Sequence, residues 1–184
     1  GDYIYEGGIN PNAIRRNNSP EIFTLGDYRN RHALYKTDAS LQAAHARFPF
    51  VVTWDDHEVD NNYAADIQEA GAPRDAFLQR RAAAYRAYWE HMPLRRAQRP
   101  VGPDMTLYRF LDYGRLARIN VLDTRQYRTD QPCGDLVRVP CPEVYDPAAT
   151  LVGGAQEQWL QKNLLLSRAR WNVVAQQVMM TQMD

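Results

Sequence analysis

Hydrophobic and polar positions form distinct blocks along this chain, and three blocks have the spacing of helices. Residues 27–47 carry apolar side chains three and four positions apart, and Asp38 offers the start of a second helix inside them. Residues 74–91 show an apolar face with the same period, which Pro93 stops. Residues 154–167 repeat the pattern. We expect helices in these three regions, the first of them divided at Asp38.

Shorter apolar runs predict strands. Residues 48–54 form a β-rich run that stops abruptly at Asp55, which is typical of a buried strand that delivers polar groups at its C-terminal end. Residues 107–111 and 116–122 flank a Tyr-Gly turn and predict a hairpin. Residues 171–178 predict a last buried strand.

The order of these elements predicts an α/β fold with a layered, mixed sheet. Residues 60–73 and 127–152 are polar and predict loops, and the second is long enough to suggest the rim of an active site. No composition shift marks an interior boundary. Both ends look like cuts through structure, so we expect residues 1–184 to be part of one catalytic domain of a longer chain.

Charge and composition narrow the function classes. The chain has 22 basic and 22 acidic side chains and a formal net charge of zero, which argues against nucleic acid as a stable partner. No run of about 20 apolar residues occurs, so we expect no membrane span. Cys133 and Cys141 lie eight positions apart in a loop-like stretch. The loop composition favours a local disulfide over free thiols, although spacing alone does not establish it.

The densest polar feature directly follows the predicted strand at residues 48–54. From Asp55 to Asn62 it contains four carboxylates, one imidazole and two amides. Such groups are ligands for Ca, Mg, Mn, Fe or Zn, and α/β proteins bind ligands at strand ends. The alternative is a solvated acidic loop, or carboxylates that cap a following helix.

Two further motifs offer chemistry. Asp2 and Tyr5 stand three residues apart in a glycine-bounded turn; a carboxylate can bridge two metal ions, and a tyrosinate can ligate ferric iron. Alternatively, they form a turn and pack under a loop. In the second motif, Arg125 or Arg128 could clamp a phosphate, but Asp123 and Arg125 could also form a structural ion pair. The remaining histidines are expected to be surface or helix-dipole residues: His32, His45 and His91.

These motifs together resemble the PhoD-like alkaline phosphatases, a branch of the calcineurin-like metallophosphoesterase superfamily. Gly-Asp-Tyr-Ile-Tyr-Glu and Trp-Asp-Asp-His-Glu-Val-Asp-Asn-Asn carry the resemblance with Leu-Asp-Thr-Arg-Gln-Tyr-Arg. The matching segments are residues 1–6, 25–38, 41–45, 54–62, 122–128, 156–160 and 171–182. The last two motifs quoted are specific in combination.

The resemblance implies a two-layered sandwich flanked by helices, incomplete in this chain, with a ferric ion and calcium at the strand ends. It implies hydrolysis of phosphomonoesters, with phosphodiesters as further substrates, in an exported protein. Asp2 would bridge metals and Tyr5 would ligate iron. His57 would lie near the phosphate or behind a ligand. The other implied metal ligands are Asp55 and Asn62, with Asp56 and Asn61 as further candidates because the residues are doubled.

The family also has a cysteine iron ligand upstream and an Asp/His metal motif downstream of the segments matched here, so this chain is expected to hold about half of the ligands. The sequence therefore predicts metal-dependent hydrolysis of a small phosphate ester. Two alternatives remain: a metal-free glycoside hydrolase that uses paired carboxylates, and a non-catalytic binding domain stabilised by calcium.

Overall fold

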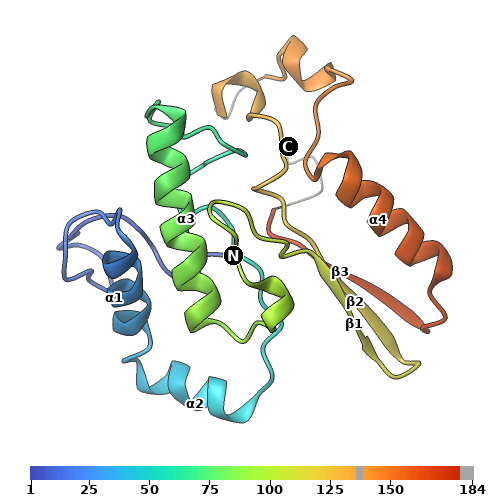
Figure 1. Cartoon of the computed structure of the whole chain (residues 1–184), viewed down its shortest axis with the longest axis horizontal. Coiled ribbons are helices and arrows are strands. Elements are labelled where there is room, and N and C mark those ends of the chain that lie inside the picture. The colour runs from blue at the N-terminus through green and yellow to red at the C-terminus, as the bar shows by residue number, and fades with distance from the viewer. Residues whose placement is uncertain (136–138, 179–184) are drawn as a thin grey trace.

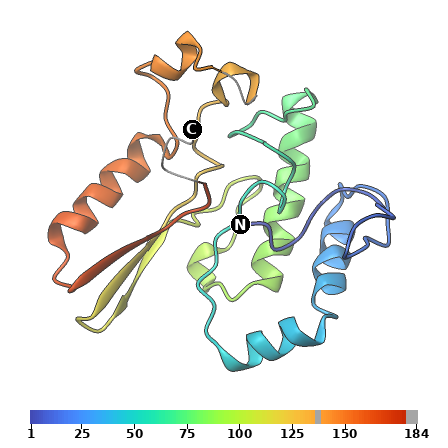
Figure 2. The ribbon, with the colours of Figure 1, turned by 180° about the vertical axis from the view of Figure 1, so that it is seen from behind.

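The computed structural model describes residues 1–135 and 139–178. Its helices are α1 (Leu25–Tyr35), α2 (Ala39–Arg47), α3 (Arg74–His91) and α4 (Gly153–Leu166). Its strands are β1 (Arg109–Tyr113), β2 (Ala117–Val121) and β3 (Trp171–Ala175). Figures 1 and 2 agree in placing α1, α2 and α3 on one side of the molecule and the sheet with α4 on the other.

The helices follow their sequence patterns closely. The division at Asp38 is confirmed, because its side chain accepts a hydrogen bond from the Leu41 amide and caps α2. α1 begins two residues before the predicted Asp27. Thr24 and Asp27 form a reciprocal capping box there, which satisfies amides that the first turn leaves free. α3 spans 74–91 as predicted.

The sheet is mixed, as predicted. β1 and β2 form the antiparallel hairpin, with Arg109 opposite Val121, and β3 pairs with β2 in parallel. α4 lies between β2 and β3 in the sequence, as the connection between parallel strands requires. Cys133 and Cys141 form a disulfide within the long loop that precedes α4.

Two expectations about strands are wrong. Residues 48–54 are extended but form no strand in the described part of the chain, because side chains rather than a neighbouring strand bond their backbone. The Val52 carbonyl accepts from Arg109 at 2.9 Å, and the Trp54 carbonyl accepts from Gln177 at 2.6 Å. β3 is not buried, since Trp171 is 63% exposed. The described residues thus hold one three-stranded sheet, and the sandwich remains an expectation.

The main core lies between α1, α3 and the extended segment that leads to Asp55. Trp54 is fully buried and stacks on Tyr85 of α3, with ring centroids 4.0 Å apart and planes 6° from parallel. Tyr28 of α1 reaches the same core, where its hydroxyl donates to the Val59 carbonyl. The loop that follows Asp55 is therefore anchored on both sides by buried aromatic side chains.

No helix in the described ranges is long and apolar enough to span a membrane.

His32 contradicts its expected surface position. It is fully buried in α1, its ring stacks on His91 with centroids 5.1 Å apart, and neither ring nitrogen has a hydrogen-bond partner among the described residues. Burial, and then the nearby charges of His91 and Lys36, lower the pKa of His32 to about 3. The folded protein therefore keeps this imidazole neutral.

The buried His32 should make the fold sensitive to acid. The pKa of His32 is lower in the folded protein than the value of 6.5 in the unfolded chain. The imidazole therefore binds a proton below pH 6.5 in the unfolded chain but only near pH 3 in the folded protein. We expect the free energy of unfolding to fall by roughly 2 kcal/mol between pH 7 and pH 5 from this group alone. Urea unfolding of His32→Leu should show a correspondingly smaller loss, and equal losses in both proteins would contradict the prediction.

Candidate metal centre

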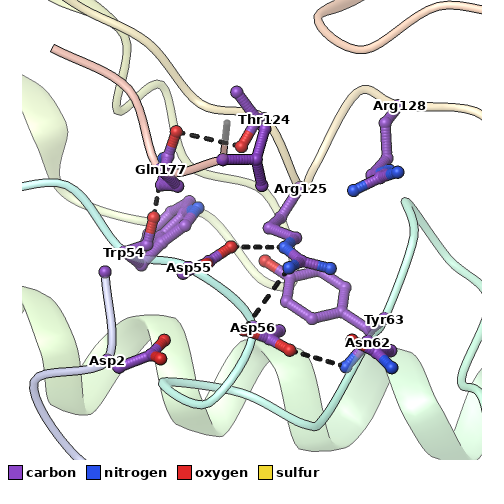
Figure 3. A network of polar contacts seen from close by, with 12 residues as sticks. Asp2, Trp54, Asp55, Asp56, Asn62, Tyr63, Thr124, Arg125, Arg128 and Gln177 are labelled. Carbon is purple, nitrogen blue, oxygen red and sulfur yellow. Dashed lines mark hydrogen bonds and ion pairs between the residues drawn. The ribbon is translucent and has the colours of Figure 1, made fainter. Parts of the chain in front are cut away.

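Two segments more than 50 residues apart bring their polar groups together. Ligand atoms of Asp2, Asp56 and His57 all lie within 4.8 Å of one another. The Tyr5 hydroxyl donates to Asp2 Oδ2 at 3.3 Å. In Figure 3, Asp2 and Asp56 come from separate stretches of chain and lie on the same side of Arg125. Two oxygen-bearing groups and an imidazole thus meet at one place, next to a phenol.

The backbone is unusual at two of the predicted ligands. Asp2 has φ 38° and Asn62 has φ 52°, both in the left-handed region. Asp and Asn enter this region more readily than other non-glycine residues, but it still costs free energy, and such strain clusters at functional sites. The backbone amide of Asn62 donates to Asp56 Oδ2 at 2.8 Å, and this hydrogen bond holds the conformation of the residue.

A buried glutamate orients His57. Glu6 Oε2 lies 2.8 Å from His57 Nδ1, while Glu6 Oε1 accepts from the Asn61 amide at 2.7 Å. Burial lowers the pKa of His57, but the Glu6 hydrogen bond and charge, aided by Asp56 and Asp2, outweigh it and raise the pKa to about 9. The contact engages Nδ1, so Nε2 is the ring nitrogen that a metal ion would use, an arrangement typical of metal-binding histidines.

Arg125 and Asp55 form a buried pair beside this group. Arg125 Nε lies 2.5 Å from Asp55 Oδ1, and Arg125 Nη2 lies 3.4 Å from Asp56 Oδ1 (Figure 3). The expected Asp123–Arg125 ion pair is wrong: Asp123 accepts from the backbone amide of Arg125 at 3.0 Å, and the guanidinium points to the aspartates instead. Asp55 is therefore engaged by an arginine, whereas Asp56 also faces Asp2.

Arg128 differs from Arg125 in its partners. Its side chain is half-buried, and its Nε donates a long hydrogen bond of 3.4 Å to the Thr129 carbonyl. Among the described residues, no carboxylate lies within ion-pair distance of its guanidinium. Burial and the neighbouring charge of Arg125 lower the pKa of Arg128. This cation therefore lies near the site with donors to spare.

The side-chain amides of Asn61 and Asn62 both point to Glu69. Nδ2 of Asn61 donates to Glu69 at 2.6 Å, and Nδ2 of Asn62 lies 3.3 Å from the other oxygen of Glu69. Gln131 in turn donates to the Asn62 carbonyl at 2.7 Å, which ties the long loop to the centre. These contacts engage the Nδ2 atoms of both asparagines, and their Oδ1 atoms remain the predicted metal-binding atoms.

Sequence reasoning missed Glu58 as a connecting residue. Its side chain is 1% exposed, and its two oxygens accept backbone amides from both ligand-bearing segments: Tyr3 on one side and Asp55, at 2.7 Å, on the other. Burial raises the pKa of Glu58 to about 7, against the effect of these amides. Its signal in the sequence was only its place in the acidic motif.

The sequence also gave no sign that Asp123 and Gln177 connect the two segments. Asp123 is fully buried and accepts from Trp54 Nε1 at 3.1 Å and from the amides of Arg125 and Gln126. Gln177, just after β3, donates to the Trp54 carbonyl, and its oxygen accepts from Thr124 at 2.9 Å (Figure 3). These contacts join the residues next to Asp55 to those next to Arg125, across separations that no local pattern reveals.

The donor set fits a hard metal ion. Asp2 and Asp56 supply carboxylate oxygens and His57 supplies a nitrogen whose opposite ring atom is held by Glu6. Asp2 is solvent-exposed, so an ion and a ligand could reach the group from solution. Oxygen-rich sets of this kind suit calcium, magnesium, manganese or ferric iron.

This chain is similar to known proteins. A family model described as PhoD-like phosphatase matches residues 1–184, which confirms the predicted resemblance. "Alkaline phosphatase D" of Bacillus subtilis (strain 168) is 60% identical over 183 residues, covering 97% of this chain and 31% of that protein. A solved "Structure of PhoD" superposes with a TM-score of 0.94 at 58% identity, covering 99% of this chain and 36% of that one. The chain spans about a third of these relatives, and it belongs to the PhoD-like phosphatase family.

Proposed function

We propose that this chain carries part of the active site of a metal-dependent enzyme that hydrolyses small phosphate monoesters, with phosphodiesters as further substrates. The observation that carries the proposal is the Asp2–Asp56–His57 group, whose ligand atoms lie within 4.8 Å of one another. Membership of the PhoD-like phosphatase family supports the reaction class. Ferric iron and calcium are the proposed ions.

The residues would divide the work as follows. Asp2 and Asp56 would hold the metal together with His57. Tyr5 would join them as a tyrosinate, although burial and the nearby Asp2 raise the pKa of its hydroxyl and so favour the protonated form. A bound metal ion activates the nucleophile and offsets charge that develops on the phosphoryl oxygens. Asp55 would complete the ligand set only on exchanging its contact with Arg125.

Arg128 is the proposed phosphate ligand. Its guanidinium has no carboxylate partner among the residues described, whereas that of Arg125 is already bonded to Asp55. A planar guanidinium can bind two phosphate oxygens and stabilise the equatorial charge in phosphoryl transfer. Arg125 would instead hold the two aspartates in place.

Replacing Arg128 by alanine tests this assignment. We expect kcat/KM for a phosphate monoester to fall about 100-fold in the full-length protein, because the transition state loses a charge-assisted contact. The melting temperature should stay near that of the wild type, since Arg128 makes no buried ion pair in the described structure. Arg170→Ala, at an exposed position next to the start of β3, is the control. Unchanged kinetics in Arg128→Ala would remove it from the site.

Chelation separates the proposed enzyme from its alternatives. We expect the full-length protein to hydrolyse p-nitrophenyl phosphate and to lose turnover on treatment with a chelator, with recovery when iron and calcium are restored. A glycoside hydrolase with paired carboxylates would cleave glycosides and ignore the chelator. A calcium-stabilised binding domain would lower its melting temperature on chelation but would show no turnover at any stage.

We infer export from the family resemblance, and one structural feature supports it. Cys133 and Cys141 form a disulfide, and such bonds persist mainly in oxidising compartments outside the cytosol. Separating the cell envelope and medium from the cytosol, and blotting each fraction, would test this. Protein confined to the cytosol would overturn it.

A further inference from the structure

A hollow of about 790 Å³ adjoins the metal centre. Tyr5, His57 and Asn61 line it together with the loop of residues 7–17 and Tyr35 of α1. The volume falls in the range of pockets that hold small organic ligands. A molecule whose one end reached His57 and Asp56 would therefore have room for its other end here.

The charges in this hollow are already paired. Glu6 bonds His57 at 2.8 Å, and Arg15 bonds Asp38 at 2.7 Å. Among the described residues that line the hollow, no charged side chain lacks an opposite charge. A second phosphate or a cationic group would meet no complementary free charge, whereas an uncharged group would lose little on entry.

The exposed lining is largely aromatic and aliphatic. Tyr5 is 43% exposed and its ring lies 4.3 Å from that of His57, while the Ile14 side chain, also in the lining, is completely exposed. Tyr35 is half-buried, and the Arg15 guanidinium lies over its ring, 5.2 Å from the ring centroid. Flat rings pack well on such surfaces.

We propose that this hollow binds the uncharged, ring-bearing alcohol part of a phosphate ester whose phosphate lies at Asp2, Asp56 and His57. The inference rests on the proposed function, because it takes the metal centre as the place of the phosphate. It adds a source of specificity: esters of aromatic alcohols should react faster than esters of alcohols too small to reach Tyr35.

Gly7 offers a way to fill the hollow without changing the centre. A Cβ built at Gly7 meets no atom within 4 Å, and its φ lies outside the left-handed region. The Gly7 carbonyl is held by Arg31 and Asn17, each at 2.8 Å, so the backbone stays anchored when a side chain is added. Gly154 in α4 is equally open and likewise lacks a positive φ, which makes Gly154→Leu a matched control.

The test compares kcat/KM for phenyl phosphate and methyl phosphate in the full-length protein. We expect Gly7→Leu to lower the phenyl value at least tenfold while the methyl value stays within twofold, because only the larger alcohol needs the hollow. Gly154→Leu should leave both values unchanged. Equal losses for both esters, or no loss for either, would overturn the proposal. Ile14→Asn, at a fully exposed position, should act in the same direction should Gly7→Leu fail to fold.

A separate measurement distinguishes failure of the hollow from failure of the proposed function. If the wild type hydrolyses neither ester, the phosphatase assignment is wrong. Phenol is then titrated into the wild type and Gly7→Leu, followed by the NMR signals of Tyr5 and Tyr35. Shifts in the wild type that are lost in the variant would support the hollow as a ring-binding site, and the absence of shifts in both would overturn it.

Discussion

Asp2→Asn is expected to remove metal from the protein and to lower kcat for a phosphate monoester by at least about 100-fold, because loss of even a residue behind a metal ligand costs 10- to 100-fold. Asp2 contributes a charge that the neutral amide cannot replace, and it lies within ligand distance of both Asp56 and His57. Elemental analysis and steady-state kinetics of the full-length protein provide the measurement.

The fold should survive this substitution, because Asp2 is exposed and its carboxylate accepts a long hydrogen bond of 3.3 Å from the exposed Tyr5 hydroxyl. Asp75→Asn is the matched control: it removes a carboxylate with 93% of its side chain exposed, in the first turn of α3, and should change neither metal content nor turnover. If Asp2→Asn retained both metal and wild-type kcat, Asp2 would not be a ligand and the proposed centre would lose its main support.

Asp123→Ala is expected to cost at least ~3 kcal/mol in the free energy of unfolding. The carboxylate is fully buried and accepts from Trp54 Nε1 and from the amides of Arg125 and Gln126. Alanine would leave these donors buried without a partner, at about 1–3 kcal/mol for each group that water cannot reach. Urea denaturation of the chain would measure the loss.

The same substitution should also weaken metal binding. Asp123 fixes the backbone of Arg125 and the ring of Trp54, which directly precedes Asp55. Weaker calcium binding in the fraction that remains folded, measured by calorimetry, would show this positioning effect. Asp112→Ala removes a half-exposed carboxylate bonded to Arg118 in the hairpin and should change the free energy of unfolding far less, because water solvates both charges. Equal losses in the two variants would show that burial of Asp123 has no special role.

The helices were predictable because their signals are local. α3 is bounded by residues 74 and 91 as its 3.6-residue period indicates, and Asp38 caps α2 through an amide three residues ahead. Residues 48–54 had an equally clear strand composition, but a strand needs a neighbour. In the described chain the side chains of Arg109 and Gln177 take that place, so the prediction was wrong.

The site was predictable as a region and not as a geometry. The doubled Asp55–Asp56 and Asn61–Asn62 left the ligands open, because adjacent residues of the same kind share one pattern while their side chains point in different directions. The structure directs Asp55 to Arg125 and Asp56 to both Asp2 and Arg125. His32 was assigned to the surface or to the helix dipole because it is a lone polar residue within a helical pattern, and only the packing of α3 against α1 buries it.

By itself, the sequence determined the residue types of the centre, the family and the helix boundaries, since these depend on composition and on contacts a few residues apart. The tertiary structure decided which groups meet. Glu58 bonds the amides of Tyr3 and Asp55, and Gln177 reaches Trp54 across 123 positions. Hydrogen bonds form between groups that the fold brings within about 3 Å, whatever their separation along the chain. That distance, which no linear pattern encodes, leaves Arg128 without a carboxylate partner among the described residues and pairs Arg125 with Asp55.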